Sequence, residues 1–417
     1  MAEASGAAGV GTEPRAAGGP TGAGSSRHFV AVAAIIVLFL ATASAPSPIY
    51  VVYQRLWGFS SGVLTVVFAV YVVGLLGSLL VVGALSDHVG RRPVLGAAIA
   101  LQIVALALFV LAGDVVVLSA ARFLQGVATG AAITTLSAAL VDLEPPRAPG
   151  RAGVVNSVAP VGGLAVGALG SGALVEFAPW PTRLVYVVLL VGSVLAAVAV
   201  AAMPEPTTRR PGALASLRPR VGVPARLRAD VLAVTPILIA LWALSGLYLA
   251  LGPSVVAEVF GLRNHLVGGL VVSVLCATGA LTSFLLRHRS APGMLVPAAV
   301  SLGLGTLITL VGVTSGNAVV AVVGTAVAGL GFGAGSLATF GTFARIAAPH
   351  ERGALFAVVY VIAYLAFSVP AVAAGFATSA VGLRATAEVY AIAVIALTVV
   401  ALVLRLALRR RTVSPDR

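Results

Sequence analysis

Twelve apolar runs divide this chain, and each is long enough to cross a lipid bilayer as a helix, which takes about 20 residues. Hydrophobic residues make up 59% of the chain and charged residues only 9%. Such a balance would leave a water-soluble domain with an apolar surface almost everywhere. The sequence therefore predicts an all-α integral membrane protein with twelve transmembrane helices, at about 29–53, 61–86, 94–112, 115–142, 152–176, 182–202, 230–256, 266–286, 293–313, 317–343, 353–378 and 384–408.

The first run has a competing interpretation. It follows Arg27 and His28, and residues 41–45 are small, as in the cleavage site of a secretory signal peptide. Two observations oppose cleavage. The apolar character continues through residues 46–50, and removal would leave an odd number of helices in a chain that otherwise divides into matching halves. We therefore expect this run to remain as a membrane span.

The arginines are distributed unequally between the two ends of the predicted helices. All 26 basic residues are arginine. Assigned loop by loop, 21 fall on one side and 4 on the other, and Arg122 lies within a run. Because short basic loops stay in the cytoplasm, we expect a multi-pass protein of the cell's inner (plasma) membrane with both termini in the cytoplasm.

The same pattern divides the chain into two bundles of six helices. A short repeat supports a duplication: residues 83–86 recur almost unchanged as 279–282, and Arg91 and Arg287 each follow eight residues after the first glycine. The expected segments are a disordered cytoplasmic tail (1–28), a six-helix bundle (29–203), a cytoplasmic linker (204–229), a second, pseudo-symmetric six-helix bundle (230–408) and a cytoplasmic tail (409–417).

A short polar segment from Gly83 to Arg92 separates the second and third runs. A helix at this point places Asp87 and Arg91 one turn apart, and Gly90 permits a tight reversal before the next run. The simplest interpretation is a basic loop that only orients the protein in the membrane. The alternative is a corner that holds its charges in a fixed, functional contact.

This segment resembles the loop signature of the major facilitator superfamily, and the chain as a whole is most similar to its twelve-helix drug/proton antiporter branch. The resemblance implies that the loop latches the two halves in the outward-facing state. In that state Asp87 would face the helix that begins at Arg352 and Gly353, and Arg91 would pair with Asp142. The matching positions are Gly83, Leu85, Asp87, Gly90, Arg91 and Arg92.

The second copy of the loop departs from this signature, because Ser283 stands where the acid is expected. The resemblance therefore implies a latch on one side only.

The fourth run contains a second match to the family, formed by Arg122, Gln125 and Gly126. An arginine within the bilayer costs at least about 2.5 kcal/mol by insertion scales, so it should not face lipid unpaired. Two interpretations stay open. Arg122 extends to the outer headgroups, or it faces the interior, where related transporters use this arginine in proton coupling or to bind substrate anions.

The fifth run resembles the antiporter signature of the family, although imperfectly. Ala159 replaces an expected glycine, and the paired glycines come one residue early. A proline removes one helical hydrogen bond, and glycines allow a neighbouring helix to approach. The candidate hinge consists of Pro160, Gly162, Gly163 and Gly167. Ordinary helix packing would explain the same glycines.

The acidic residues are also informative. None of the thirteen lies at a predicted membrane midplane, whereas many relatives that export cationic drugs carry a buried carboxylate there. The expected interior suits a neutral, amphipathic or anionic solute better than a dication; its polar residues are Tyr50, Gln102, Arg122, Gln125, Asn156 and Trp242.

The resemblance thus implies a secondary active transporter that exports a small amphipathic compound by alternating access. We expect no enzyme activity, metal or cofactor, because no nucleotide loop, metal cluster or nucleophile motif occurs; the proton gradient would supply the energy. The expected partners are a small-molecule substrate and the lipid bilayer, without nucleic acid, and the protein should work as a monomer. Two alternatives remain: an importer of a sugar or metabolite, and a membrane sensor or scaffold that transports nothing.

The arginine bias makes a topological prediction. Cysteines placed at Gly150 and Arg209 should react with a membrane-impermeant maleimide only from the cytoplasm, and a cysteine at Gly316 only from outside. Labelling of position 150 from outside intact cells would overturn the orientation.

Overall fold

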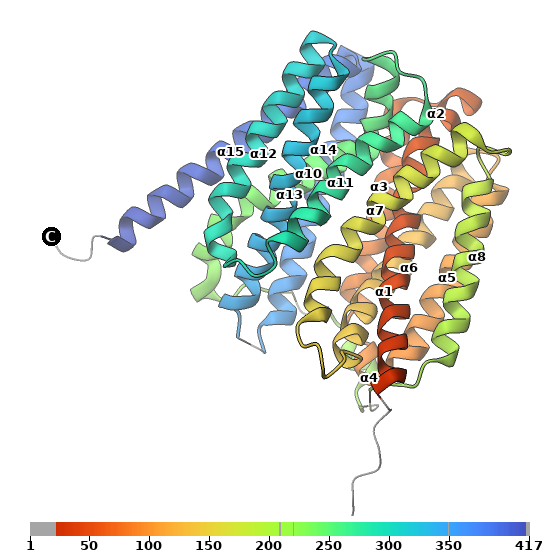
Figure 1. Cartoon of the computed structure of the whole chain (residues 1–417), viewed down its shortest axis with the longest axis vertical. Coiled ribbons are helices and arrows are strands. Elements are labelled where there is room, and N and C mark those ends of the chain that lie inside the picture. The colour runs from red at the N-terminus through yellow and green to blue at the C-terminus, as the bar shows by residue number, and fades with distance from the viewer. Residues whose placement is uncertain (1–21, 208–209, 220, 349, 414–417) are drawn as a thin grey trace, which may run out of the picture.

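The computed structural model describes residues 22–413 except 208–209, 220 and 349, and side chains between residues 26 and 406. Every regular element in this part of the chain is a helix (Figure 1). In chain order the elements are α1 (Gly22–Ser44), α2 (Pro46–Trp57), α3 (Ser61–Val82), α4 (Ser86–Val89), α5 (Arg91–Leu111), α6 (Val115–Asp142), α7 (Arg151–Phe177), α8 (Leu184–Ala202), α9 (Ala213–Ser216), η1 (Ala225–Leu227), α10 (Arg228–Glu258), α11 (His265–Leu285), α12 (Ala291–Ser315), α13 (Ala318–Ile346), α14 (Arg352–Val381) and α15 (Leu383–Val413).

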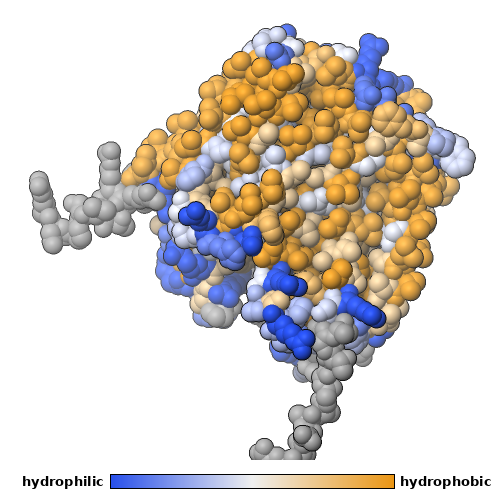
Figure 2. All heavy atoms as spheres, in the orientation of Figure 1, coloured by the Kyte–Doolittle hydropathy of each residue, from blue (hydrophilic) through white to orange (hydrophobic). Residues whose placement is uncertain are grey.

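Within the described residues, twelve helical segments are long and apolar enough to cross a membrane, which confirms the predicted fold class. α1 and α2 together form the first span, Ser26–Trp57. η1 and α10 form the seventh, Ala225–Glu258. Figure 2 shows a broad hydrophobic surface with hydrophilic residues gathered near its ends. This is the distribution that helices in lipid require.

Three segment boundaries differ from the prediction. α1 begins at Gly22, so the last residues of the expected tail at 1–28 are helical, and residues 1–21 lie outside the described residues. α15 continues to Val413, past the expected end at 408, because no glycine or proline stops the arginine-rich segment that follows. The expected linker at 204–229 contains α9, η1 and the first residues of α10.

The first six and last six spans pack in the same pattern. In the first half, α1 packs against α6 and α7, α3 against α6, and α5 against α6 and α8. In the second half, α10 packs against α13 and α14, α11 against α13, and α12 against α13 and α15. Each pairing therefore has its counterpart in the other half, as a duplication would produce. Figure 1 shows the halves in red to yellow-green and in green to blue.

Glycines explain how closely α3 and α6 approach each other. A Cβ atom at Gly126 would lie 2.1 Å from Tyr71 O, and a Cβ atom at Gly130 would lie 2.3 Å from Leu75 O. Only glycine leaves room for two backbones at this distance. The second half uses the same device between α11 and α13, where a Cβ atom at Gly333 would lie 2.1 Å from Gly279 O.

The two halves contact each other at one end of the bundle, which we call the closed end. There α7 packs against α11 and α3 against α14. Ser273 Oγ donates to Ala165 O over 2.7 Å, and Ser47 Oγ donates to Leu249 O over 2.5 Å. The other end carries α4 and the loops to which most arginines were assigned, and we call it the basic end.

Candidate functional site

The corner between α3 and α5 gathers its charged residues around Arg91. Arg91 Nη1 donates to Asp87 Oδ1 over 2.5 Å, and Nε donates to Asp142 Oδ2 over 3.0 Å. Nη1 also donates to Ser86 Oγ over 2.6 Å. Arg91 is buried, whereas the Asp87 side chain is 51% exposed. The structure thus brings together the three charged residues that the resemblance pairs.

Glu205, from the connection after α8, completes this corner, and the sequence reasoning missed it. Its two carboxylate oxygens accept from Arg91 N over 2.7 Å and from Arg92 N over 3.0 Å. These N–H groups begin α5 and have no partner within the helix, so the carboxylate stabilises its positive end. Gly90 makes the contact possible, because its φ is +112° and a Cβ atom there would lie 2.8 Å from Glu205 Oε2.

The connection between the halves is bound to both of them at the basic end. Near its start, Thr207 Oγ1 donates to Asp142 Oδ2 over 3.0 Å. Near its end, Arg226 forms an ion pair with Glu351, just before α14. The predicted linker therefore contacts the charged corner on one side and the start of α14 on the other.

The latch contact that the resemblance implies is not formed in this conformation. Asp87 pairs with Arg91 of its own corner, and no hydrogen bond or ion pair joins the described part of that corner to α14. Arg352 Nε instead donates to Ala347 O over 3.3 Å, and a Cβ atom at Gly353 would have nothing within 4 Å. The halves are joined at the closed end, so the corner and the start of α14 remain separate.

The second-half copy of the corner has a different arrangement. Arg287 donates to Phe284 O over 2.6 Å and lies 4.2 Å from the centre of the Phe284 ring. Ser283 Oγ donates to Gly333 O over 3.3 Å. The arginine therefore folds back onto the end of α11, and among the described residues the ion pairs of the first half have no counterpart here.

Arg122 lies inside the first half and is only 1% exposed. Its Nη1 donates to Ala43 O over 3.1 Å and to Gln125 Oε1 over 2.6 Å, and its guanidinium stands 4.4 Å from the centre of the Tyr71 ring. Extension to the outer headgroups, one of the two interpretations left open above, is therefore wrong for this conformation. The structure records no carboxylate partner for Arg122 among the described residues, and its Nε atom is buried without an acceptor.

A proline in the first span explains why one carbonyl group is free to receive a hydrogen bond from Gln125. Pro46 has no N–H, so Thr42 O lacks its usual helical donor, and Gln125 Nε2 donates to it over 2.9 Å. α1 ends and α2 begins at this point. A carbonyl in hydrocarbon needs a donor from the protein. In the sequence, the signals for the contact between Gln125 and Thr42 O were Pro46 in the first run and the pair of Arg122 and Gln125 in the fourth.

Two tyrosines belong to the same buried region. Tyr50 is 1% exposed, and its hydroxyl has no hydrogen-bond partner among the described residues. The ring of Tyr71 lies 4.4 Å from the Arg122 guanidinium. We call Arg122, Gln125, Tyr50 and Tyr71 the central cluster.

Six aromatic rings continue from Tyr364 through the second half, and we call them the aromatic ladder. Four lie along one face of α14, at a spacing of three or four residues. The Tyr364 ring lies 5.0 Å from Trp242 and 6.3 Å from Tyr360. Trp242 Nε1 is buried without an acceptor. The ladder consists of Trp242, Phe340, Phe356, Tyr360, Tyr364 and Phe367, and all but Phe367 are only partly buried. Phe367 meets Phe68 of the first half at 4.9 Å.

The glycines of the predicted hinge in α7 differ in their surroundings. Gly163 and Gly167 face α1, where Cβ atoms would lie 2.7 Å from Val37 O and 2.1 Å from Ala41 O. Gly162 has nothing within 4 Å of a Cβ atom, so no close approach requires a glycine there. Pro160 lies inside the continuous α7 helix.

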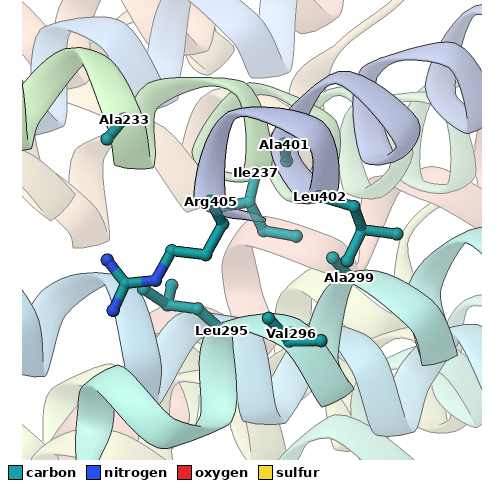
Figure 3. Close-up of a pocket in the computed structure, with 8 residues that line it drawn as sticks. All are labelled: Ala233, Ile237, Leu295, Val296, Ala299, Ala401, Leu402 and Arg405. Carbon is teal, nitrogen blue, oxygen red and sulfur yellow. The ribbon is translucent and has the colours of Figure 1, made fainter. Parts of the chain in front are cut away.

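Small hollows in the second half lie away from the central cluster. One, of about 10 Å³, separates α10, α12 and α15 beside Arg405 (Figure 3). It has room for one water molecule. Another, of about 60 Å³, is walled mostly by apolar side chains of α10 to α13 and α15. Neither joins the two halves. Among the described residues no group of three potential metal ligands occurs.

Comparison with known proteins agrees with this architecture. The family profile described as Major Facilitator Superfamily matches residues 31–366. Similar solved structures include a variant of the nucleoside transporter NupG (TM-score 0.68, 10% identity, 91% of this chain and 99% of that chain). The human organic anion transporter MFSD10 (TETRAN) has a TM-score of 0.66 and 16% identity over 91% of this chain and 99% of that chain.

A bacterial homolog of the human lysosomal transporter Spinster has a TM-score of 0.66 and 14% identity over 94% of this chain and 96% of that chain. A search of curated proteins finds no match. Identities this low demonstrate a shared fold and leave the solute undetermined. Because the profile covers most of the chain and the twelve spans pack as two matching halves, the chain belongs to the major facilitator superfamily and is a transporter rather than an enzyme.

Proposed function

We propose that this protein is a secondary active transporter of the drug/proton antiporter type, which exports a small amphipathic compound by alternating access. The main support is that the halves meet at one end only. Between them lie the central cluster and the aromatic ladder, whose Phe367 ring meets the Phe68 ring of the first half at 4.9 Å. A site between two repeats is where such transporters hold their solute.

The orientation of the protein assigns a state to this conformation. The arginine bias supports a cytoplasmic location for the basic end, in a protein of the inner membrane. The closed end then faces outward, and the conformation is the one that receives solute from the cytoplasm. In the opposite state Asp87 would leave its corner and face the start of α14, as the resemblance implies.

The residues around the proposed site favour a planar aromatic solute that is neutral or anionic. The partly buried rings of the ladder offer faces and edges for stacking, a contact worth about 0.5–1.5 kcal/mol for each pair of rings beyond the area buried. Arg122 is a buried cation without a carboxylate partner among the described residues. An anionic or carbonyl group of the solute would supply the missing acceptor, whereas a dication would meet repulsion.

The remaining parts of the proposal concern energy and assembly. We propose that the proton gradient drives export and that no cofactor takes part. Each chain contains both halves of the proposed site, so a monomer suffices. The protein needs only its small-molecule solute and the lipid bilayer.

Naphthalene-2-sulfonate is a suitable probe, because it is planar, aromatic and ionised throughout the range from pH 5 to 8. We expect proteoliposomes with an acidic interior to accumulate it at least tenfold over protein-free vesicles, with accumulation abolished by a protonophore. Cyclohexanesulfonate, an anion without a ring face, should accumulate far less. Equal uptake of naphthalene-2-sulfonate by vesicles with and without protein would contradict the proposed class of solute.

Matched variants on α14 separate stacking from general damage to the helix. Tyr360→Ala removes a ladder ring and should reduce uptake about tenfold, since its three ring contacts are lost together with its face for the solute. Leu365→Ala alters an exposed side chain of the same helix and should leave uptake unchanged. An equal fall in uptake in the two variants would show that the aromatic ladder does not bind the solute.

Asp87→Asn should reduce transport by an order of magnitude or more while the protein stays folded. In this conformation Arg91 retains Asp142 and Ser86 as partners, and an ion pair to a half-exposed Asp87 contributes only about 0–1 kcal/mol. The loss of transport would therefore come from a weakened contact in the opposite state. Uptake of naphthalene-2-sulfonate and thermal unfolding in detergent measure the two effects, and a large fall in unfolding temperature would indicate a structural role instead.

Arg122 and Gln125 should respond differently to replacement by leucine. Arg122→Leu removes a buried charge without a carboxylate partner but also takes the donor from Ala43 O and Gln125 Oε1, so the two effects should offset and the unfolding temperature should change little while transport is abolished. Gln125→Leu leaves Thr42 O without its donor and should lower stability by about 1–3 kcal/mol. Wild-type transport by Arg122→Leu across pH 6 to 8 would show that Arg122 serves only to pair with carbonyls of the broken span.

A further inference from the structure

A histidine and a glutamate pair across the two halves at the closed end. Glu176, in the last turn of α7, accepts hydrogen bonds from His265 N over 2.9 Å and from His265 Nδ1 over 3.0 Å. His265 is the first residue of α11. One carboxylate thus contacts both the imidazole and the positive end of a helix from the other half.

The backbone packing around this pair makes it part of the seal between the halves. A Cβ atom at Gly172 would lie 2.7 Å from His265 O, and a Cβ atom at Gly269 would lie 2.3 Å from Ala168 O. α7 and α11 therefore touch along their backbones next to the pair. If the halves separate at this end, as alternating access requires, both hydrogen bonds to Glu176 must break.

The geometry fixes where the histidine carries its proton. An ionised carboxylate only accepts hydrogen bonds, so Nδ1 bears the hydrogen that points to Glu176. Nε2 is buried and has no hydrogen-bond partner in the part of the chain that the structure describes. Protonation of His265 in the closed end would place a second N–H where no acceptor exists. A buried donor without an acceptor costs more than a partly exposed ion pair gains.

The pair of Glu176 and His265 is separate from the other charged groups at this end. The hydrogen bonds and the ion pair of Glu176 within the described residues all go to His265. The charged side chains on the elements and connections nearby are Arg55, Asp114, Arg183, Glu258, Arg263, Arg384 and Glu388. Of these, Arg384 and Glu388 pair with each other on α15.

We propose that Glu176 and His265 form a proton-responsive gate, in which a proton on either residue opens the closed end. The closed contact needs an ionised carboxylate and an imidazole whose Nε2 is bare. Separation of the halves exposes Nε2 and the carboxylate to water, where each can bind a proton. Acid therefore favours the state that is open at this end, and loss of the proton allows closure.

Opening of the closed end by acid is what an exporter that exchanges solute for protons requires. A proton bound from the acidic side would hold the gate open while solute leaves, and release of the proton would return the protein to the present conformation. The gate itself does not depend on the solute, so it can be tested without one. Its failure would leave the proposed transport function intact.

Spin labels at opposite halves measure the gate directly. Val116 at the start of α6 and Val319 at the start of α13 are 76% and 72% exposed at the closed end, and the natural Cys276 is buried. We expect electron–electron double resonance of the Val116→Cys/Val319→Cys protein in lipid nanodiscs to show one short distance at pH 8. A longer distance should appear and grow in share as the pH is lowered from 8 to 5.5.

Variants of Glu176 and His265, with matched controls, test whether these two residues form the gate. His265→Asn keeps a donor near the position of Nδ1 but cannot be charged, so the short distance should persist from pH 5.5 to 8. Glu176→Gln should show the longer distance even at pH 8. His288→Asn and Glu388→Gln, which alter a histidine at the basic end and an acid of the α15 pair, should behave as the wild type. A wild-type distance that does not change with pH, or an acid transition that survives in His265→Asn, would overturn the proposal.

Discussion

Carbonyl groups left without helical donors determine how this bundle is joined. Proline at position 46 leaves Thr42 O for Gln125, and proline at position 253 leaves Leu249 O, four residues earlier, for Ser47 Oγ of the other half. In hydrocarbon these groups must find donors within the protein. The free carbonyl at Thr42 therefore holds Gln125 beside Arg122. The free carbonyl at Leu249 contributes to the seal between the halves.

The pseudo-symmetry of the fold does not extend to its charges. Helix pairings and close glycine contacts repeat in both halves, because both halves must pack helices in the same solvent. The corner at Arg91 holds two carboxylates and receives a third, Glu205, at the helix that follows. Its copy at Arg287 turns back onto Phe284. Packing was thus retained after duplication, while the charged contacts became specific to one half.

The sequence could predict the spans and the local contacts but not those between distant segments. Hydrophobicity located the twelve spans, and helical spacing placed Asp87 beside Arg91. The pairing of Arg91 with Asp142 came from the family resemblance. Glu205 and His265 lie in or beside loops, and nothing in their neighbourhood indicates which partner the fold will bring to them. The expected contact of Asp87 with α14 is not formed in this conformation and stays a prediction for the opposite state.

The close glycine contacts within each half also have a mechanical meaning. Because the backbones of α3 and α6 lie close together at Gly126 and Gly130, these two helices would turn together in the proposed change between states. α6 has 28 residues, so it is about 42 Å long, and turning it by about ten degrees moves its far end by about 7 Å. A seal of a few hydrogen bonds can thus control an opening wide enough for a planar molecule.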